Sequence, residues 1–324
     1  MDSIEQIVQK IRFYILISFL GLGTLQAQQE PIYTQYMFNP LNYNPAYAGS
    51  RSVLSAALVI RKQWAGVDGS PTVTTFSAHS PLKDKNMGVG FELTNDEIGP
   101  TSNLWVQGSY AYRIKISRIH KGRIGFGLKA GVFRTQYNWD EITYKDTDDG
   151  LVGIGTESYV RPTFDFGIYY HNTNINFAGI SITNIGSPKL GIDYDESVDN
   201  FSYTSQSRLN SNLILTYGHI FELNDRVIFR PSFLARTGFE FKPVLDVNLS
   251  LLFDATFWAG ISYRTSNTIA VVLEYEITKQ IKFGYSYDYD LNPLKTGFSG
   301  SHEIFLGFNY NVFKSRMRSP RYYF

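Results

Sequence analysis

The chain has 324 residues, of which 16% are aromatic and 18% are charged, with 30 Lys and Arg against 29 Asp and Glu. This balance excludes a basic nucleic-acid-binding protein, because phosphate binding depends on an excess of cationic side chains. The absence of cysteine excludes disulfide scaffolds, thiolate zinc sites and cysteine nucleophiles. Many aromatic and few charged residues are typical of transmembrane β-barrels, whose apolar side chains are hidden by alternation.

Residues 1–27 have the layout of a secretory signal peptide. Lys10 and Arg12 precede an apolar run over 13–23, and the small residue Ala27 offers a cleavage site. A membrane anchor is the alternative, but the run is about half of the ~20 residues that a spanning helix needs. We therefore expect an exported protein that is cleaved after Ala27.

The chain after residue 50 alternates between apolar and polar residues. In 280–288, Ile281, Phe283, Tyr285 and Tyr287 share one face, while Lys282 and Asp288 share the other. About fourteen such runs of roughly ten residues follow one another, which is the length of a tilted membrane-spanning strand. The predicted spans are 51–62, 71–80, 86–95, 103–114, 122–134, 162–171, 174–183, 210–221, 226–236, 242–253, 256–264, 268–277, 280–288 and 301–313.

The lengths of the connections separate a membrane barrel from a soluble β-sandwich. The longest, over 135–161, 184–209 and 289–300, all follow odd-numbered strands. Outer-membrane barrels have long outside loops of this parity and short periplasmic turns, whereas a sandwich has no reason to sort its loops. The polar face carries Lys129, Glu274, Glu276, Lys282 and Asp288, which suits a wet lumen. These features predict an all-β, antiparallel, up-and-down transmembrane barrel over 51–313.

Residues 28–50 do not fit the strand pattern. They are polar and aromatic and contain Pro31, Pro40 and Pro45, and proline is excluded from central strands. Because this segment precedes the first strand, we expect it to begin on the periplasmic side. It is either a tail tucked over the barrel mouth, or a plug or a contact for a periplasmic partner. Residues 314–324 form a basic tail that is either a solvated extension or a periplasmic docking peptide.

The segment YTQYMFNPLNYNPAYAGS resembles the opening of the PorP/SprF family of the type IX secretion system in the Bacteroidetes lineage. Further similar motifs follow in order along the chain: R-x-Q-W at 61–64, F-W-x-G-x-S-Y-R at 257–264, Y-S-Y-D at 285–288 and G-S-H-E-I at 300–304. The motif positions selected as candidate site residues are Tyr33, Gln35, Tyr36, Phe38, Asn39, Asn44, Pro45, Ala46, Tyr47, Gly49, Trp64, Trp258, Arg264, Asp288, His302 and Glu303.

The resemblance implies an outer-membrane component of type IX secretion and gliding motility. It implies as partners a secreted, adhesin-like cargo protein with a C-terminal export domain and periplasmic secretion components, with the outer-membrane lipid around the barrel. Within the outside loops, Trp139, Tyr144 and Tyr159 are the candidate contacts with cargo, because aromatic side chains anchor protein interfaces.

No enzymatic chemistry emerges from the sequence. The five histidines form no H-E-x-x-H motif, no G-x-S-x-G motif is present, and His302 and Glu303 should face opposite sides of a strand. The acidic cluster over 146–149 lacks a calcium-loop pattern. We therefore expect no catalytic residues, no metal and no cofactor. A passive or solute-selective porin is the alternative function, and an outer-membrane hydrolase has the least support.

Overall fold

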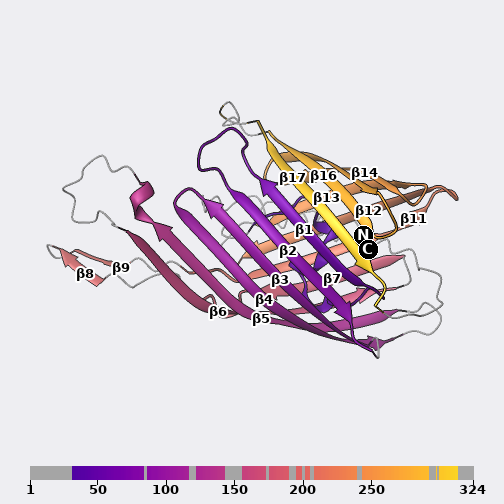
Figure 1. Cartoon of the computed structure of the whole chain (residues 1–324), viewed down its shortest axis with the longest axis horizontal. Helices are drawn as coiled ribbons and strands as arrows, with labels where there is room; N and C mark the ends of the chain where they lie inside the picture. Colours follow the sequence, from indigo (N-terminus) through magenta and orange to yellow (C-terminus); the bar gives the residue numbers. More distant parts are fainter. Residues whose placement is uncertain are drawn as a thin grey trace, which may run out of the picture.

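The structure is a computed structural model that describes residues 31–83, 86–116, 122–142, 155–172, 175–189, 195–198, 201–204, 208–238, 243–291, 297 and 299–312. Within these ranges fourteen antiparallel strands form a closed barrel (Figure 1). The ring strands are β1 (Leu54–Lys62), β2 (Thr72–Pro81), β3 (Met87–Ile98), β4 (Thr101–Lys115), β5 (Arg123–Asn138), β6 (Thr156–His171), β7 (Asn176–Thr183), β10 (Asn212–His219), β12 (Val227–Gly238), β13 (Val244–Phe253), β14 (Phe257–Arg264), β15 (Thr268–Glu276), β16 (Ile281–Asp290) and β17 (Ser301–Tyr310).

The ring closes between its first and last strands. β1 pairs with β17 from Leu54↔Tyr310 to Lys62↔His302. β10 pairs directly with β12, and the short strand β11 (Phe221–Glu222) pairs with the beginning of β12. Because the ring is closed, the backbone N–H and C=O groups of each strand form hydrogen bonds with the strands on both sides. A barrel wall in the hydrocarbon of a membrane requires this. All fourteen predicted strands are confirmed. The hairpin of β8 (Asp195–Val198) and β9 (Phe201–Thr204) lies in the connection between β7 and β10.

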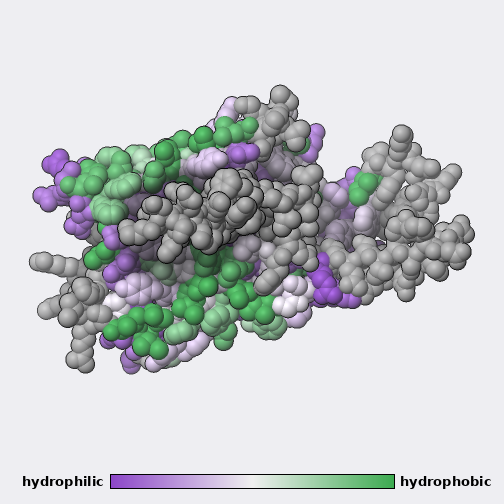
Figure 2. All heavy atoms as spheres, turned by 180° about the vertical axis from the view of Figure 1, so that it is seen from behind, coloured by the Kyte–Doolittle hydropathy of each residue, from purple (hydrophilic) through white to green (hydrophobic). Residues whose placement is uncertain are grey.

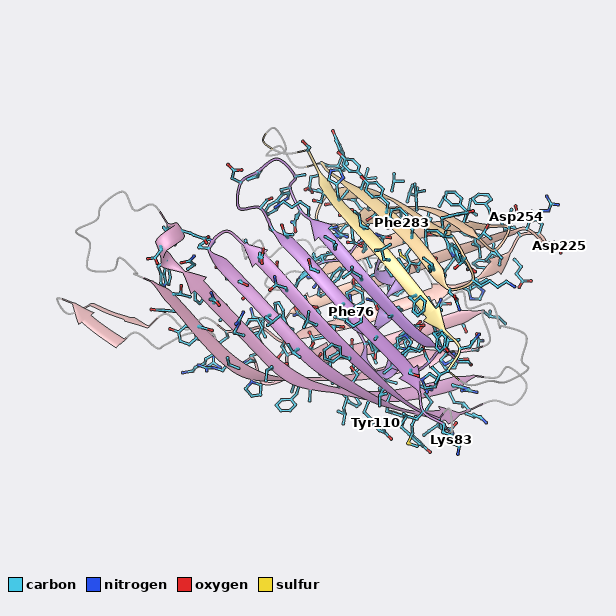
Figure 3. All side chains as sticks on the ribbon, in the orientation of Figure 1. Phe76, Lys83, Tyr110, Asp225, Asp254 and Phe283 are labelled. Carbon is cyan, nitrogen blue, oxygen red and sulfur yellow. The ribbon has the colours of Figure 1, made fainter. Side chains whose placement is uncertain are left out.

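The outer surface of the wall is apolar and the inner surface is polar. Phe76, Tyr110 and Phe283 point away from the barrel, and Leu128 is 62% exposed (Figure 3). Figure 2 shows hydrophobic side chains gathered along the flank. The charged residues Lys83, Asp225 and Asp254 lie in turns at one end (Figure 3). On the inner face, Lys129, Glu274 and Asp288 are buried as predicted. A soluble protein has its apolar residues inside and its polar residues outside. The reverse arrangement seen here is that of a membrane-spanning barrel.

The two ends of the barrel differ. Leu54 and Tyr310 lie at what we term the terminal end, where the strands are joined by connections such as 254–256 and 277–280. The opposite, long-loop end carries the connections 139–155, 184–211 and 291–300. The parity predicted for the three longest connections is therefore confirmed. In the described parts of the chain, no helix is long and apolar enough to cross a membrane.

The connection predicted over 135–161 is shorter than expected. β5 and β6 remain paired from Thr135↔Tyr159 to Asn138↔Thr156, so the connection spans 139–155. Gln136, Asn138, Thr156 and Ser158 are polar on the outward face of this extension, and Val160 is apolar, so the alternation of apolar and polar residues is too weak to reveal the strand. Tyr159 consequently lies in β6 rather than in a loop.

The segment before β1 runs through the barrel interior. This lumenal segment, residues 31–50, contains three short 3-10 turns: η1 (Tyr36–Phe38), η2 (Pro40–Asn42) and η3 (Pro45–Tyr47). Its start lies toward the long-loop end, since the Pro31 carbonyl accepts a hydrogen bond from Arg236 near the end of β12. The expectation that it begins at the same end as β1 is therefore wrong. The segment instead crosses the lumen and reaches the terminal end only at its junction with β1.

A charge on the outer wall should destabilise the barrel. Leu128 lies between Tyr110 and Phe166 in the strand register, and the substitution Leu128→Arg places a cation in this apolar band. We expect a loss of about 2–4 kcal/mol in the free energy of unfolding, as for Arg in the middle of a bilayer. Urea unfolding in lipid vesicles measures this loss. Leu223→Arg, in a turn at the terminal end where Leu223 is 59% exposed, is the matched control and should be neutral.

Candidate functional site

The lumenal segment is built from local turn signals in its own sequence. Pro40 and Pro45 occupy the first positions of η2 and η3, where the missing N–H costs nothing. The Asn44 side chain caps η3 by accepting a hydrogen bond from the Ala46 N–H at 2.9 Å. The Asn44 amide also donates to the carbonyl oxygens of Ile168, at 2.9 Å, and Ile180, at 3.3 Å. A single asparagine thus shapes the turn and attaches it to β6 and β7.

Thr34 lies at the centre of a buried ion cluster formed by Thr34, Arg61, Asp246, Arg264, Asp288 and Glu303. Its hydroxyl lies 2.7 Å from both carboxylate oxygens of Asp288, to which it donates. The same oxygen accepts from Arg61 Nη1 at 3.1 Å and from Arg264 Nη2 at 3.2 Å. One threonine of the segment therefore connects two guanidinium groups and a carboxylate from three strands.

Glu303 holds the main chain of the segment. Its two carboxylate oxygens accept from the backbone N–H groups of Thr34 and Gln35, each at 2.9 Å. Arg61 pairs with Glu303 at 3.2 Å and with Asp288 at 2.7 Å. Because Glu303 and Arg61 lie on β17 and β1, these bonds cross the closure of the ring.

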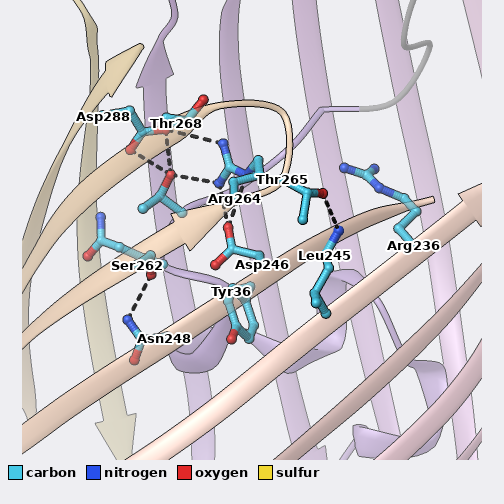
Figure 4. A network of polar contacts seen from close by, with 12 residues as sticks. Tyr36, Arg236, Leu245, Asp246, Asn248, Ser262, Arg264, Thr265, Thr268 and Asp288 are labelled. Atoms are coloured by element: carbon cyan, nitrogen blue, oxygen red, sulfur yellow. Dashed lines mark hydrogen bonds and ion pairs between the residues drawn. The ribbon is translucent and has the colours of Figure 1, made fainter. Parts of the chain in front are cut away.

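Arg264 extends the cluster to β13 (Figure 4). Its Nε and Nη2 atoms lie 3.0 and 2.9 Å from Asp246 Oδ2, and its Nη1 lies 3.4 Å from Asp288. Every charged member is at most 5% exposed. Buried charges are tolerated only when they are paired and hydrogen-bonded, so this cluster depends on the segment that completes it.

Aromatic contacts hold the segment at Phe38, which follows the residues of the ion cluster along the segment. The guanidinium of Arg230, on β12, lies 4.0 Å from the centroid of Trp258 and 5.4 Å from that of Phe38. Phe38 also contacts Phe305, with ring centroids 5.9 Å apart. A cation between two rings in a desolvated site is worth about 2 kcal/mol per ring. Phe38 of the segment is therefore fixed by both charge and packing.

On the opposite wall the segment rests on glycines. A Cβ atom on Gly127 of β5 would meet backbone atoms of Pro45 and Ala46, and one on Gly167 of β6 would meet the Asn44 side chain. Gly88 of β3 lies equally close to the Ala48 carbonyl. This glycine floor lets the segment lie directly against the sheet.

Two cations bind the carbonyl groups of the segment above the glycine floor. Arg113 donates to Ala48 O at 2.5 Å, and Lys129 donates to Leu41 O at 3.3 Å. Lys129 also pairs with Glu92 at 3.4 Å and Asp165 at 3.7 Å. The segment therefore has polar attachments on both sides of the lumen.

Three tyrosines of the segment remain neutral. Burial raises the pKa of the Tyr33, Tyr36 and Tyr43 phenols above the usual range. Tyr33 hydrogen-bonds Thr75, and the Tyr36 hydroxyl lies 3.2 Å from Ser232. These three side chains consequently act in the lumen as neutral hydrogen-bonding and packing groups.

Most of the motif residues selected from the sequence converge in the lumen. The segment positions Tyr33, Gln35, Tyr36, Phe38, Asn39, Asn44, Pro45, Ala46, Tyr47 and Gly49 and the wall positions Trp258, Arg264, Asp288 and Glu303 are all buried in the lumen. Gln35 contacts Glu303 and Phe38 contacts Trp258, whereas Asn39 and Gly49 contact Ser77 and His79. Two do not join them. Trp64 lies in the connection between β1 and β2, with its N–H donating to Ser301 Oγ at 3.2 Å. His302 faces outward, against Tyr285 and Tyr287.

Residues absent from that selection complete the site. Arg230 and Asp246 occupy the polar face of strands that alternate between apolar and polar residues, and a charged residue on that face indicates an inward position with a partner. The alternating glycines at 88 and 90 and at 125 and 127 were a second signal. Gly125 and Gly127 both face the crowded interior, where an added Cβ atom would meet the backbone of Ala46.

The candidate cargo contacts lie at the long-loop end. Trp139, in η4 (Trp139–Glu141), stacks on Tyr137 with centroids 5.7 Å apart. Tyr159 also contacts Tyr137, edge-on, with ring centroids 6.4 Å apart, and the guanidinium carbon of Arg161 lies 6.0 Å from the centroid of the Tyr159 ring. We term Tyr137, Trp139 and Tyr159 the aromatic rim. Tyr144 lies outside the described residues, as does the acidic cluster over 146–149. The described side chains contain no group of three or more His, Asp or Glu that could hold a metal ion.

This arrangement defines the class of protein: a membrane-spanning β-barrel whose lumen is occupied by its own N-terminal segment. Among solved structures, the *Pseudomonas putida* toluene transporter TodX is similar, with a TM-score of 0.50 and 10% identity over 84% of this chain and 94% of that chain. A *Pseudomonas aeruginosa* FadL homologue has a TM-score of 0.50 and 11% identity over 88% and 95% of the two chains. At these identities the likeness extends to the fold alone. No curated protein sequence matches the chain.

The sequence profile of the family described as "Type IX secretion system membrane protein PorP/SprF" matches residues 25–308. The chain belongs to this family, as its motifs indicated.

Removing the charge of Glu303 should loosen the lumenal segment. In the variant Glu303→Gln, Arg61 loses a buried partner and the side-chain amide cannot accept both backbone N–H groups. We expect a loss of about 3–5 kcal/mol in the free energy of unfolding, as for other broken buried ion pairs. Urea unfolding followed by tryptophan fluorescence measures it. The exposed Glu222→Gln is the control, and an equal midpoint for both variants would contradict the role of Glu303.

A methyl group on the glycine floor should displace the segment. In Gly127→Ala the new Cβ meets the main chain of Pro45 and Ala46, which cannot yield without moving the turn. We expect the variant to form a barrel in which a protease cuts within residues 33–48, as mapped by mass spectrometry. Gly108→Ala, on the outer face of β4 with nothing within 4 Å, is the matched control. Equal resistance of the two variants would show that the floor does not hold the segment.

Proposed function

We propose that this protein is an outer-membrane component of the type IX secretion and gliding machinery that binds a secreted surface protein and helps to export or anchor it. The observation that carries the proposal is the family match over residues 25–308. The filled lumen supports it, because a segment bonded to both walls suits a protein-binding barrel better than a wide aqueous pore. The chain would reach the membrane through its signal peptide, cleaved after Ala27.

The long-loop end is the proposed cargo-binding face and would point away from the cell. Long loops face outside in barrels of this kind. The aromatic rim supports the assignment, since stacked, half-buried tyrosine and tryptophan rings offer rigid apolar area at little cost in conformational entropy. The terminal end, with the basic tail over 314–324, would then face periplasmic secretion components.

A channel for a small solute is the second candidate. The likeness of the fold to a transporter favours it. Small cavities, partly open to solvent, also lie in the lumen, one lined by Tyr33 and Tyr43 and the other by Phe38 and Tyr47. This candidate requires the segment to move or to leave a path beside it.

The first experiment is a pull-down of the tagged protein from outer membranes in mild detergent. A large surface protein or periplasmic secretion components in near-equal amount would support the secretion function. A lone barrel in repeated preparations, together with steady ion conductance in planar bilayers, would instead favour the channel.

The aromatic candidates give a sharper prediction. Replacing Trp139, Tyr144 and Tyr159 together with Ala should strongly reduce the cargo that co-purifies, while the heat-modifiable mobility of the folded barrel stays unchanged. The control Phe221→Ala, Leu223→Ala, Phe253→Ala removes three exposed apolar side chains at the terminal end. Full cargo retention in a folded variant that lacks Trp139, Tyr144 and Tyr159 would show that these residues do not bind the cargo.

A further inference from the structure

The lumenal segment starts close to the mouth that the long loops surround. The Pro31 carbonyl oxygen accepts a hydrogen bond at 3.4 Å from Arg236, which lies near the end of β12. Pro31 also lines a cavity together with Thr183, the last residue of β7. The first residue of β10 pairs with the last residues of β7 and β12, so both strands end at the long-loop end. Pro31 therefore lies at this end of the barrel.

The segment leaves the lumen at the opposite, terminal end. Near its start, the Thr34 hydroxyl accepts at 3.2 Å from Arg264, the last residue of β14. At its other end, the Gly49 N–H donates at 3.1 Å to His79, which pairs with Ser55 near the start of β1. The chain therefore enters the barrel at one end and begins the wall at the other.

The lumen leaves the chain before Pro31 no way back to the terminal end. All residues from Tyr33 to Gly49 are buried except Pro40 and Asn42, so the segment itself fills the interior. A second stretch of chain would have to displace these contacts. The ring is closed, so it offers no opening between strands. The long-loop mouth is the exit that remains.

We infer that the mature N-terminus emerges at the long-loop end and lies on the opposite side of the membrane from the C-terminus. The wall alone would place both ends on one side, since Leu54 of β1 pairs with Tyr310 of β17 at the terminal end. The lumenal segment carries the N-terminus across. In the orientation of the proposed function, on which this last step rests, the N-terminus is displayed at the cell surface as part of the face that binds cargo.

The test places the same short epitope tag at one of three sites in the full chain: directly after Ala27, within 146–149 of a long loop, or after Phe324. Antibody binding is measured on intact cells and again after the outer membrane is permeabilised. A tagged periplasmic protein reports whether the cells are intact. We expect intact cells to show the tags after Ala27 and within 146–149, and permeabilisation to add the signal of the tag after Phe324.

The labelling also separates the path of the segment from the orientation of the barrel. If intact cells show the tag after Phe324 alone, the assumed orientation fails and the cargo-binding face fails with it. The tags after Ala27 and within 146–149 would then still share one side, which supports the inference. A tag after Ala27 that is labelled together with the tag after Phe324 overturns it, as does labelling of both termini on intact cells.

An engineered disulfide shows whether the tagged segment still lies in the lumen. A Cβ atom added at Gly90 lies 3.4 Å from the Ala48 Cβ, close to the ~3.8 Å of a disulfide, and the chain has no cysteine of its own. In the tagged variant Ala48→Cys, Gly90→Cys, oxidation should abolish maleimide labelling and reduction should restore it, with the tag after Ala27 exposed throughout.

The matched control is Ala48→Cys, Gly108→Cys, because Gly108 lies on the outer face of β4. This variant should keep its maleimide labelling under oxidation. Loss of antibody binding to the tag after Ala27 in the disulfide-locked protein would overturn the inference, because the tag would then be reached only when the segment leaves the lumen.

Discussion

The structure depends on the contact between Thr34 and the charges of the barrel wall. Arg61, Arg264, Asp288 and Glu303 come from four different strands and are removed from water. Their pairing is incomplete without the Thr34 hydroxyl and the backbone N–H groups of Thr34 and Gln35. The charged residues of the wall therefore require the segment that lies in the lumen. The position of Thr34 in turn determines which wall residues the rest of the segment contacts.

The two sides of the lumen hold the segment by different means. Strands β1, β14, β16 and β17 use charge, and the positions of Arg61 and Glu303 fix the height of Thr34. Strands β3, β5, β6 and β7 use shape, since glycine lets the main chain of the segment approach the sheet. Charge is tolerant of small shifts in distance, whereas close contact is not. The glycine floor therefore sets the register of the turns, and the ion cluster sets the position of Thr34.

The sequence predicted the barrel well because alternation is a local signal. Each of the fourteen ring strands shows an apolar outer face in its own sequence, and the loop parity follows from the strand order. It predicted the site less well, because the contacts of Thr34 with Asp288 and Glu303 span more than 250 residues. Pattern alone could not show that Asn44 lies against Gly167, or that the segment begins at the long-loop end. The extension of β5 and β6 was missed because all of its outward residues except Val160 are polar.

The path of the segment has a consequence for how the barrel is assembled. β1 and β17 lie at opposite ends of the chain, so their pairing closes the largest loop and is expected to form late. The bonds from Glu303 to Thr34 and from Arg61 to Asp288 cross this seam. A finished ring offers the segment no lateral entry and leaves only its two ends. If the segment is in place before the seam closes, its bonds to Glu303 would align the first strand with the last.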